Sequence, residues 1–301
     1  MAKKWSAKEI PNLTGKTVLV TGGNSGIGYQ TTLELAKAGA TVVITSRDVA
    51  KGKAAIAKMK EKYPGAKVIC EQLDLADLSS IRAFVERYKE TIGSLNILIN
   101  NAGVMNIPKR ELTKDGFEMH MGTNHLGHFA LTLGLLPLLR KSKGRVVAVS
   151  ALVAYNGIMD FDNLQSEKTY KPMDAYAQSK LANVLFVNEL SRREAKNGII
   201  SVAVQPGSAL TGLQRYTPQM GGLIKVFMKI AGQSVENCAL PSLYAATQPS
   251  VKSQMFFGPT GRFNKGGAGP AKMPEKANDV AMAKRLWDIS ETLTGSRWEA
   301  Q

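Results

Sequence analysis

The feature that most constrains the fold of this chain is a repeated alternation between short, mainly apolar runs rich in β-branched residues and longer segments of helical periodicity. The apolar runs lie at residues 17–21, 41–45, 67–73, 95–100, 145–150 and 199–205. An uninterrupted apolar run predicts a strand that is buried on both faces, as in parallel sheets with helical crossovers. The chain is therefore predicted to be an α/β protein with a doubly wound parallel sheet and helices on each side.

The segments outside these runs complete the predicted fold. Helices are expected over about 115 to 140 and 174 to 197, and residues 281–293 have the spacing of an amphipathic helix. Residues 256–279 are rich in Gly and Pro, which is typical of a loop. The segment at about 208–235 follows the sixth strand and is either a lid over a ligand crevice or a packed pair of helices.

Length and composition favour one domain, residues 1–301, in a reducing compartment. With 301 residues, 44% of them hydrophobic, the chain can bury one large core. Its two cysteines, Cys70 and Cys238, have neither CxxC nor Cys/His spacing, so no disulfide framework or zinc site is predicted. The N-terminal segment MAKKWSAKEIPNLTGK lacks the apolar core of a signal peptide, and no apolar run could span a bilayer. A cytoplasmic location is expected.

The net charge of +15 raises the question of an anionic partner. The lysines and arginines are dispersed over amphipathic segments instead of forming a basic arm or alternating with aromatic residues. Dispersed charge is typical of a solvated surface, so no nucleic-acid function is predicted. Peripheral contact with an anionic membrane surface is compatible with the same charge.

A glycine-rich turn, TGGNSGIG at 21–28, ends the first predicted strand and begins the next helix. Glycines there permit a tight turn and close backbone approach, and the helix would present free N–H groups to a pyrophosphate. The turn residues expected to bind a dinucleotide are Gly22, Asn24, Ser25, Gly26, Ile27 and Gly28. The position of this turn after the first strand of a doubly wound sheet predicts dinucleotide binding.

Charged residues at two later strand ends bear on the choice of nucleotide. Arg47 follows the second strand, where an acid would bind the ribose 2′-hydroxyl of NAD; its guanidinium suits a 2′-phosphate and favours NADP over NAD. The alternative is an arginine that only faces solvent. Asp74, beside Leu75 after the third strand, would accept from the adenine amino group, cap the following helix, or do both.

Tyr176 and Lys180 stand four residues apart in DAYAQSKLAN, on one face of a predicted helix. An unperturbed tyrosine has a pKa of about 10, and an ammonium group beside it favours the phenolate. The pair therefore predicts a proton donor or acceptor with a lowered pKa. Such pairs also arise by chance on amphipathic helices, so the weight of this one depends on the other motifs.

Together with these motifs, NNAG at 100–103, Asn124 in MGTNHLGHF and PG at 206–207 make the chain resemble the short-chain dehydrogenase/reductase family over almost its whole length. The stretches HLGHF, DNLQSEKTY, YAQSKLANVLF and AKRLWDIS are most similar to the retinol dehydrogenase branch and its soluble bacterial relatives. The resemblance implies a Rossmann fold and hydride transfer between a nicotinamide and a carbonyl carbon, with the cofactor supplying that chemistry.

The resemblance also implies roles for individual residues. Tyr176 would be the general acid/base, Lys180 would lower its pKa and hold the nicotinamide ribose, and Asn124 would hold a water that links Lys180 to solvent. The other implied cofactor contacts are Asn101, Ala102 and Gly103 on the adenosine side and Pro206 and Gly207 beside the nicotinamide.

Ser150 poses a separate question, because the branch carries its substrate-orienting serine one residue later, where this chain has Ala151. Neighbouring strand residues point to opposite faces, so Ser150 would join Tyr176 only if the strand bends or bulges. A second possibility is catalysis by the tyrosine alone, or with Tyr155 or a water, at a rate cost on the order of 10²- to 10³-fold. A third is that catalysis is lost and a nucleotide-binding regulatory protein remains.

His120, His125 and His128 cluster in one segment, but no carboxylate or cysteine completes a ligand set, so no metal is predicted. Met105, Tyr155 and the apolar residues at 223–230 would line a substrate pocket or belong to the core. The sequence thus predicts an NADP-dependent oxidoreductase that interconverts a lipophilic aldehyde or ketone with an alcohol. Its oligomeric state is left open.

Overall fold

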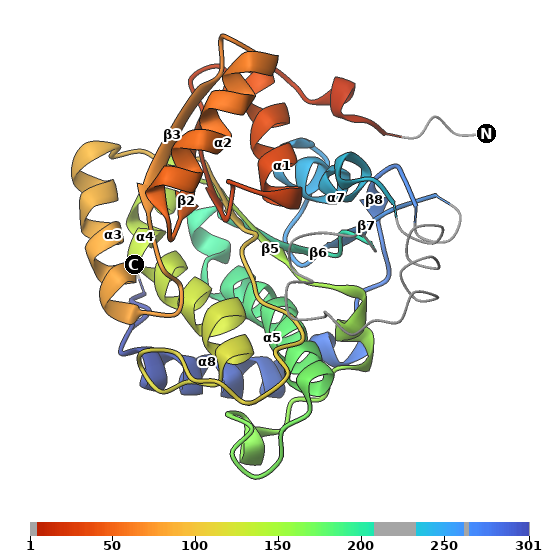
Figure 1. Ribbon diagram of the computed structural model, residues 1–301. Coiled ribbons are helices and arrows are strands. Elements are labelled where there is room, and N and C mark those ends of the chain that lie inside the picture. Colours follow the sequence, from red (N-terminus) through yellow and green to blue (C-terminus); the bar gives the residue numbers. More distant parts are fainter. Residues whose placement is uncertain (1–4, 208–232, 262–264, 301) are drawn as a thin grey trace, which may run out of the picture.

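The computed structural model describes residues 5–207, 233–261 and 265–300. The strands are β1 (Thr17–Thr21), β2 (Thr41–Ser46), β3 (Lys67–Gln72), β4 (Ile97–Asn100), β5 (Arg145–Val149), β6 (Ile200–Val204), β7 (Phe256–Gly258) and β8 (Gly269–Pro270). Over the described residues they form one sheet in the order β3-β2-β1-β4-β5-β6-β7-β8 (Figure 1). Neighbours from β3 through β7 pair in parallel, and β8 pairs antiparallel with β7. The predicted doubly wound parallel sheet is confirmed, with β8 as an antiparallel addition at one edge.

Helices cover both faces of the sheet (Figure 1). One face carries α1 (Gly26–Lys37), α2 (Val49–Lys62) and α7 (Val235–Thr247). The other carries α3 (Leu78–Thr91), α4 (Gly127–Ser142), α5 (Pro172–Arg193) and α8 (Val280–Thr294). Because successive side chains of a strand point to opposite faces, Val18 and Val20 of β1 enter the first core and Leu19 enters the second.

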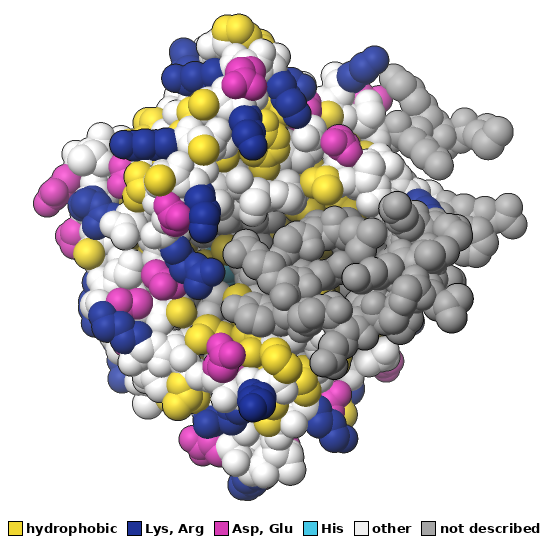
Figure 2. All heavy atoms as spheres, in the orientation of Figure 1, with side chains coloured by type: hydrophobic (Ala, Val, Ile, Leu, Met, Phe, Trp, Pro, Cys, Tyr) yellow, Lys and Arg dark blue, Asp and Glu magenta, His cyan; other side chains and the backbone are white. Residues whose placement is uncertain are grey.

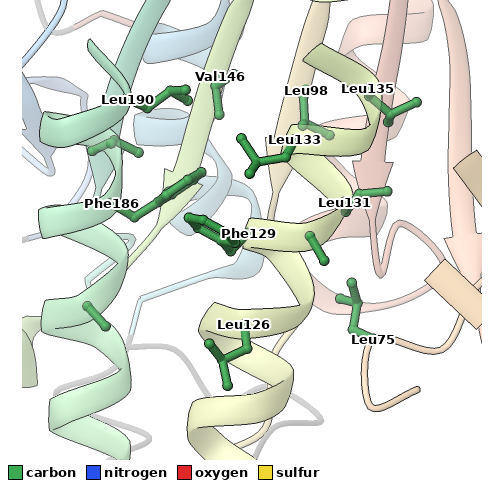
Figure 3. Close-up of a cluster of buried hydrophobic side chains, with 14 of the residues drawn as sticks. Leu75, Leu98, Leu126, Phe129, Leu131, Leu133, Leu135, Val146, Phe186 and Leu190 are labelled. Atoms are coloured by element: carbon green, nitrogen blue, oxygen red, sulfur yellow. The ribbon is translucent and has the colours of Figure 1, made fainter. Parts of the chain in front are cut away.

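The second core is built around aromatic side chains from α4, α5 and α8. Figure 3 shows Phe129 of α4 and Phe186 of α5 meeting below Val146 of β5, and their ring centroids are 5.7 Å apart. Trp287 of α8 packs edge-on against Phe129 at 4.9 Å. Burial of each such side chain stabilises the fold by about 1.5–3 kcal/mol, so these contacts fix α5 against the sheet.

The structure differs from the predicted elements in two places. The helix expected from about residue 115 begins later, as a π-helical turn at Met121–Leu126 that leads into α4. Residues 256–279, predicted to be a loop, contain β7 and β8, because Phe256 and Phe257 bury their side chains on opposite faces beside β6. The possible lid at about 208–235 lies outside the described residues except for its last three positions. Among the described helices, none has the length and apolar character needed to cross a membrane.

Candidate active site

A cavity of about 470 Å³ lies at the carboxyl ends of the parallel strands. In a parallel sheet the loops after the strands meet at one edge, and ligands bind where the winding direction reverses, here between β1 and β4. The cavity brings together every predicted site residue except Asn124: Gly22, Asn24, Ser25, Gly26, Ile27, Gly28, Arg47, Asp74, Leu75, Asn101, Ala102, Gly103, Ser150, Tyr176, Lys180, Pro206 and Gly207.

The glycine turn leaves room for a diphosphate at the start of α1. Gly22 has a φ of 64°, which favours glycine, and a Cβ on Gly28 would lie 2.4 Å from the Gly22 carbonyl oxygen. Ser25, the N-cap residue, makes no side-chain hydrogen bond to the helix, so the first N–H groups of α1 are left without a side-chain cap. Free N–H groups at a helix N-terminus bind phosphate, so this turn fits a dinucleotide pyrophosphate.

Two cations stand where the second strand ends. Arg47 is exposed and lines the cavity, and within the described part of the chain its guanidinium has no hydrogen bond or ion pair. Lys51 also lines the cavity and pairs with Asp48 at 3.3 Å. With respect to the described residues, the strand end therefore offers an unpaired arginine to an anion.

Asp74 borders the cavity but does not cap α3, so the capping alternative is wrong. Its Oδ1 accepts a hydrogen bond from the Ala76 N–H at 2.9 Å. The N-cap of α3 is Asp77, which accepts from the Ser79 N–H at 2.8 Å and also from that of Ser80. The two acids are three residues apart in similar surroundings, and the sequence alone did not show which one begins the helix.

Tyr176 and Lys180 lie one turn apart on α5, and both are buried. The Lys180 Nζ donates to the Val149 carbonyl oxygen at 3.0 Å and lies 5.8 Å from the centroid of the Tyr176 ring. Burial lowers the pKa of Lys180 to about 8. Burial also raises the pKa of Tyr176 above its ordinary value. This direction is the opposite of the predicted one, because desolvation of the phenolate dominates; the phenol therefore stays protonated at neutral pH.

Asn124 lies in the π-helical turn, fully buried behind the cavity. Its Oδ1 accepts from the Val104 N–H at 2.8 Å, and its Nδ2 donates to the Val104 carbonyl oxygen at 3.0 Å. The same Nδ2 donates to the Ser179 Oγ at 2.9 Å. The amide of Asn124 thus fixes the chain just after the NNAG turn to α5.

The Ser150 hydroxyl points to α5 and donates to the Lys180 carbonyl oxygen at 2.7 Å. Pairing of β5 with β6 advances one residue at a time to Val149 and Val204, so these described strands contain no bulge that would turn Ser150. Ala151 lines the cavity and offers only a methyl group. Tyr155 is not among the lining residues, and its Oη donates to the Lys272 carbonyl oxygen at 2.5 Å, so it does not supply the missing hydrogen bond.

The three histidines do not form a metal site; in the described ranges no three acidic, histidine or cysteine side chains gather as metal ligands. His125 is hydrogen-bonded to the Ser290 Oγ at 2.8 Å. His128 lies between the Thr21 Oγ at 2.9 Å and the Asn124 carbonyl oxygen at 3.0 Å. Burial lowers the pKa of His125 to about 3 and that of His128 to about 4, so both rings are neutral.

Sequence reasoning missed two groups of residues. A carboxylate, Glu118, does bind His120, at 2.7 Å, and the E-x-H spacing is the signal that could have revealed it. The other group lines the cavity from positions next to strand ends and predicted motifs: Thr45, Ser46, Asp48, Lys51, Leu73, Val104, Thr123, Val149, Leu152, Val153 and Met173. Met105, expected either in the pocket or in the core, also lines the cavity.

Comparisons with known proteins agree with this geometry. A family model described as short chain dehydrogenase matches residues 16–221. Retinol dehydrogenase 12 of Homo sapiens is 41% identical over 290 residues, which are 95% of this chain and 89% of that protein. A short-chain dehydrogenase/reductase of Armillaria gallica is 40% identical over 297 residues, covering 96% and 93% of the two chains.

A solved structure has the same fold over nearly the full length. It is that of an uncharacterised protein from Mycobacterium paratuberculosis, 38% identical, with a TM-score of 0.81 over 99% of this chain and 100% of that chain. The chain therefore belongs to the short-chain dehydrogenase/reductase family, where it is retinol dehydrogenase-like, and it is an NAD(P)-dependent oxidoreductase.

Proposed function

We propose that this protein is an NADP-dependent oxidoreductase that interconverts a lipophilic aldehyde or ketone with an alcohol, with Tyr176 as the general acid/base. The observation that carries the proposal is the shared cavity: the buried Tyr176 and Lys180 line the same space as the glycine turn at the start of α1. A proton donor and a dinucleotide cradle in one cavity are the two parts that carbonyl reduction requires.

The preference for NADP is supported by the end of β2. Arg47 has the planar guanidinium that binds a phosphate through two N–H groups, and the ion pair of Lys51 with Asp48 lies beside it in the cavity lining. The turn from Gly22 to Gly28 would hold the pyrophosphate, and Asp74 would accept from the adenine amino group. Bound nicotinamide supplies or accepts the hydride.

Tyr176 would supply the proton in the reducing direction. Its raised pKa keeps the hydroxyl protonated, so it donates to the substrate oxygen as charge develops there. Lys180 has a pKa of about 8, so it exchanges protons near neutral pH and can return one to the phenolate. Its ammonium also supplies donors for ribose hydroxyls. Asn124 connects the segment after NNAG to α5 through its hydrogen bonds to Val104 and Ser179.

The substrate is proposed to be lipophilic, of the retinoid kind. Apolar side chains line the cavity beyond the cofactor residues, namely Met105, Leu152, Val153 and Met173. The similar proteins named retinol dehydrogenases support the same substrate class. We place the protein in the cytoplasm, because Cys70 and Cys238 are both free thiols.

A second candidate function is a nucleotide-binding regulatory protein. Ala151 has no hydroxyl, and the Ser150 hydroxyl is engaged by the Lys180 carbonyl oxygen, which together favour this alternative. Both candidate functions include binding of NADPH, but only the oxidoreductase converts a carbonyl substrate.

The experiment that separates them is NADPH oxidation over a panel of lipophilic aldehydes and ketones, run on the wild-type chain and on Ala151→Ser. The proposal expects turnover by the wild type and a gain of up to about 10²-fold in Ala151→Ser, since one more donor reaches the substrate oxygen. A wild type that binds NADPH without turnover, beside an active Ala151→Ser variant, would reject enzymatic function for the natural sequence.

A further inference from the structure

A buried acid–histidine pair, Glu118 and His120, lies directly behind Tyr176 and has no part in the function proposed above. Glu118 is 1% exposed and His120 is 0% exposed. The Glu118 Oε1 is 2.7 Å from the His120 Nδ1. The His120 ring lies between two tyrosines, with its centroid 6.0 Å from that of Tyr176 and 6.4 Å from that of Tyr170.

The carboxylate of Glu118 is fixed at the start of the π-helical turn that carries Asn124. Its two oxygens accept the N–H groups of His120 at 2.9 Å and Met121 at 2.8 Å. Because the Glu118 oxygens already accept two backbone N–H groups, the His120 Nδ1 is assigned as the donor to Oε1 and Nε2 as an acceptor. This assignment fits the next contact, in which the Ile107 N–H donates to Nε2 at 3.4 Å.

His120 and Tyr170 hold the peptide groups of Ile107 from both sides. While the Ile107 N–H donates to His120, the Tyr170 Oη donates to the Ile107 carbonyl oxygen at 2.6 Å. Three residues earlier, Asn124 holds both backbone groups of Val104. The segment 104–107 is therefore anchored at one end by the buried Asn124 and at the other by the buried His120 and the half-buried Tyr170.

Between these anchors lies one wall of the cavity. Val104 and Met105 line it, and Asn106 has a φ of 54°, in the left-handed region that Asn adopts more readily than most residues other than glycine. The backbone that carries Met105 is therefore held by Asn124 on one side and by His120 and Tyr170 on the other.

We infer that Glu118 and His120 are positioning residues, which fix the 104–107 wall of the substrate site and support the Tyr176 ring from behind. Neither group touches the cavity, so each acts through the residues it holds. The effect of this role on KM rests on the proposed function, whereas its effect on hydrogen exchange of the 104–107 segment does not.

The test compares His120→Phe with His125→Phe. His125 is a matched control, because it lies on the same helical segment, is 2% exposed, hydrogen-bonds to Ser290 and packs against Phe129 away from the cavity. Hydrogen exchange of residues 104–110 is measured in the protein without nucleotide. We expect exchange to accelerate about tenfold in His120→Phe, the effect of one lost hydrogen bond, and to stay unchanged in His125→Phe. Equal exchange in the two variants overturns the inference.

Steady-state kinetics provide the second readout. His120→Phe is expected to raise KM for the carbonyl substrate about tenfold and leave the Kd of NADPH within about twofold, since His120 contacts the substrate wall and the Tyr176 ring and not the glycine turn. His120→Gln keeps one donor and one acceptor and should restore most of the loss. If His120→Phe fails to fold, Glu118→Gln takes its place in both measurements. A wild type without turnover rejects the proposed function, and hydrogen exchange then decides the positioning role alone.

Discussion

At the scale of single residues, the site is defined by side chains whose chemistry depends on burial. Lys180 and Tyr176 are neighbours on α5, yet burial moves their pKa values in opposite directions, toward the neutral form of each. The sequence indicated the pair but not these directions, because four-residue spacing says nothing of solvent access. A protonated phenol beside a lysine that titrates near neutral pH is suited to deliver a proton during reduction.

Substitution of the single residue Arg47 tests the proposed preference for NADP over NAD. Arg47→Ala should weaken NADPH binding by about 10- to 100-fold, the value of charge-assisted hydrogen bonds to a phosphate, and change NADH binding little. Fluorescence titration with both nucleotides measures the two Kd values. Arg82→Ala, at an exposed arginine on α3, is the control and should change neither. If Arg47→Ala weakened the binding of NADPH and NADH equally, the guanidinium would not bind the 2′-phosphate specifically.

His125 and His128 predict how stability depends on pH. Their pKa values in the folded protein, about 3 and about 4, lie below the ordinary 6.5, so the unfolded chain binds more protons in the interval between. The contribution of these two neutral rings to the free energy of unfolding should therefore be complete above pH 6.5 and should decrease as the pH is lowered toward about 4. Urea titrations at several pH values measure it. His125→Gln should flatten the decrease; an unchanged slope would contradict burial of a neutral ring.

At the scale of elements, sequence reasoning located the loops that matter because the site is built from strand ends. Each strand from β1 to β6 was visible as an apolar run, so the residues after it could be assigned to one edge of the sheet. Helix starts were harder to predict, since Asp74 and Asp77 are equally good caps by type and only the fold shows that Asp77 begins α3. The π-helical turn at Met121–Leu126 was missed because its composition matches that of an ordinary helix.

The turn between β1 and α1 allows a direct test of the cradle. A Cβ at Gly28 would lie 2.4 Å from the Gly22 carbonyl oxygen and 2.5 Å from the Asn101 Nδ2, so Gly28→Ala must displace the turn. We expect nucleotide affinity to drop at least about tenfold, since the N–H groups of α1 lose their alignment. Gly65→Ala, where the new methyl would meet only ordinary contacts, serves as the control in calorimetric titrations. Unchanged affinity in Gly28→Ala would mean that the diphosphate binds elsewhere.

At the scale of the whole molecule, one core lies on each side of the sheet, and the cavity lies along the carboxyl ends of its parallel strands. Figure 2 shows Lys and Arg side chains interspersed with Asp and Glu on the face in view, which agrees with the dispersed charge of the sequence. The alternation of strands β1 to β6 with helices follows from apolar patterning, whereas β7 and β8 do not, because they are short and rich in glycine and proline.

The measurement that tests the central claim most directly is single-turnover oxidation of bound NADPH by a lipophilic aldehyde, in the wild type and in Tyr176→Phe. Tyr88→Phe is the control, since that buried tyrosine donates to the Ser94 carbonyl oxygen away from the cavity. The account predicts hydride transfer in the wild type and in Tyr88→Phe, and a loss of about 10²- to 10⁴-fold in Tyr176→Phe with NADPH binding intact. Hydride transfer at the wild-type rate in Tyr176→Phe would contradict it.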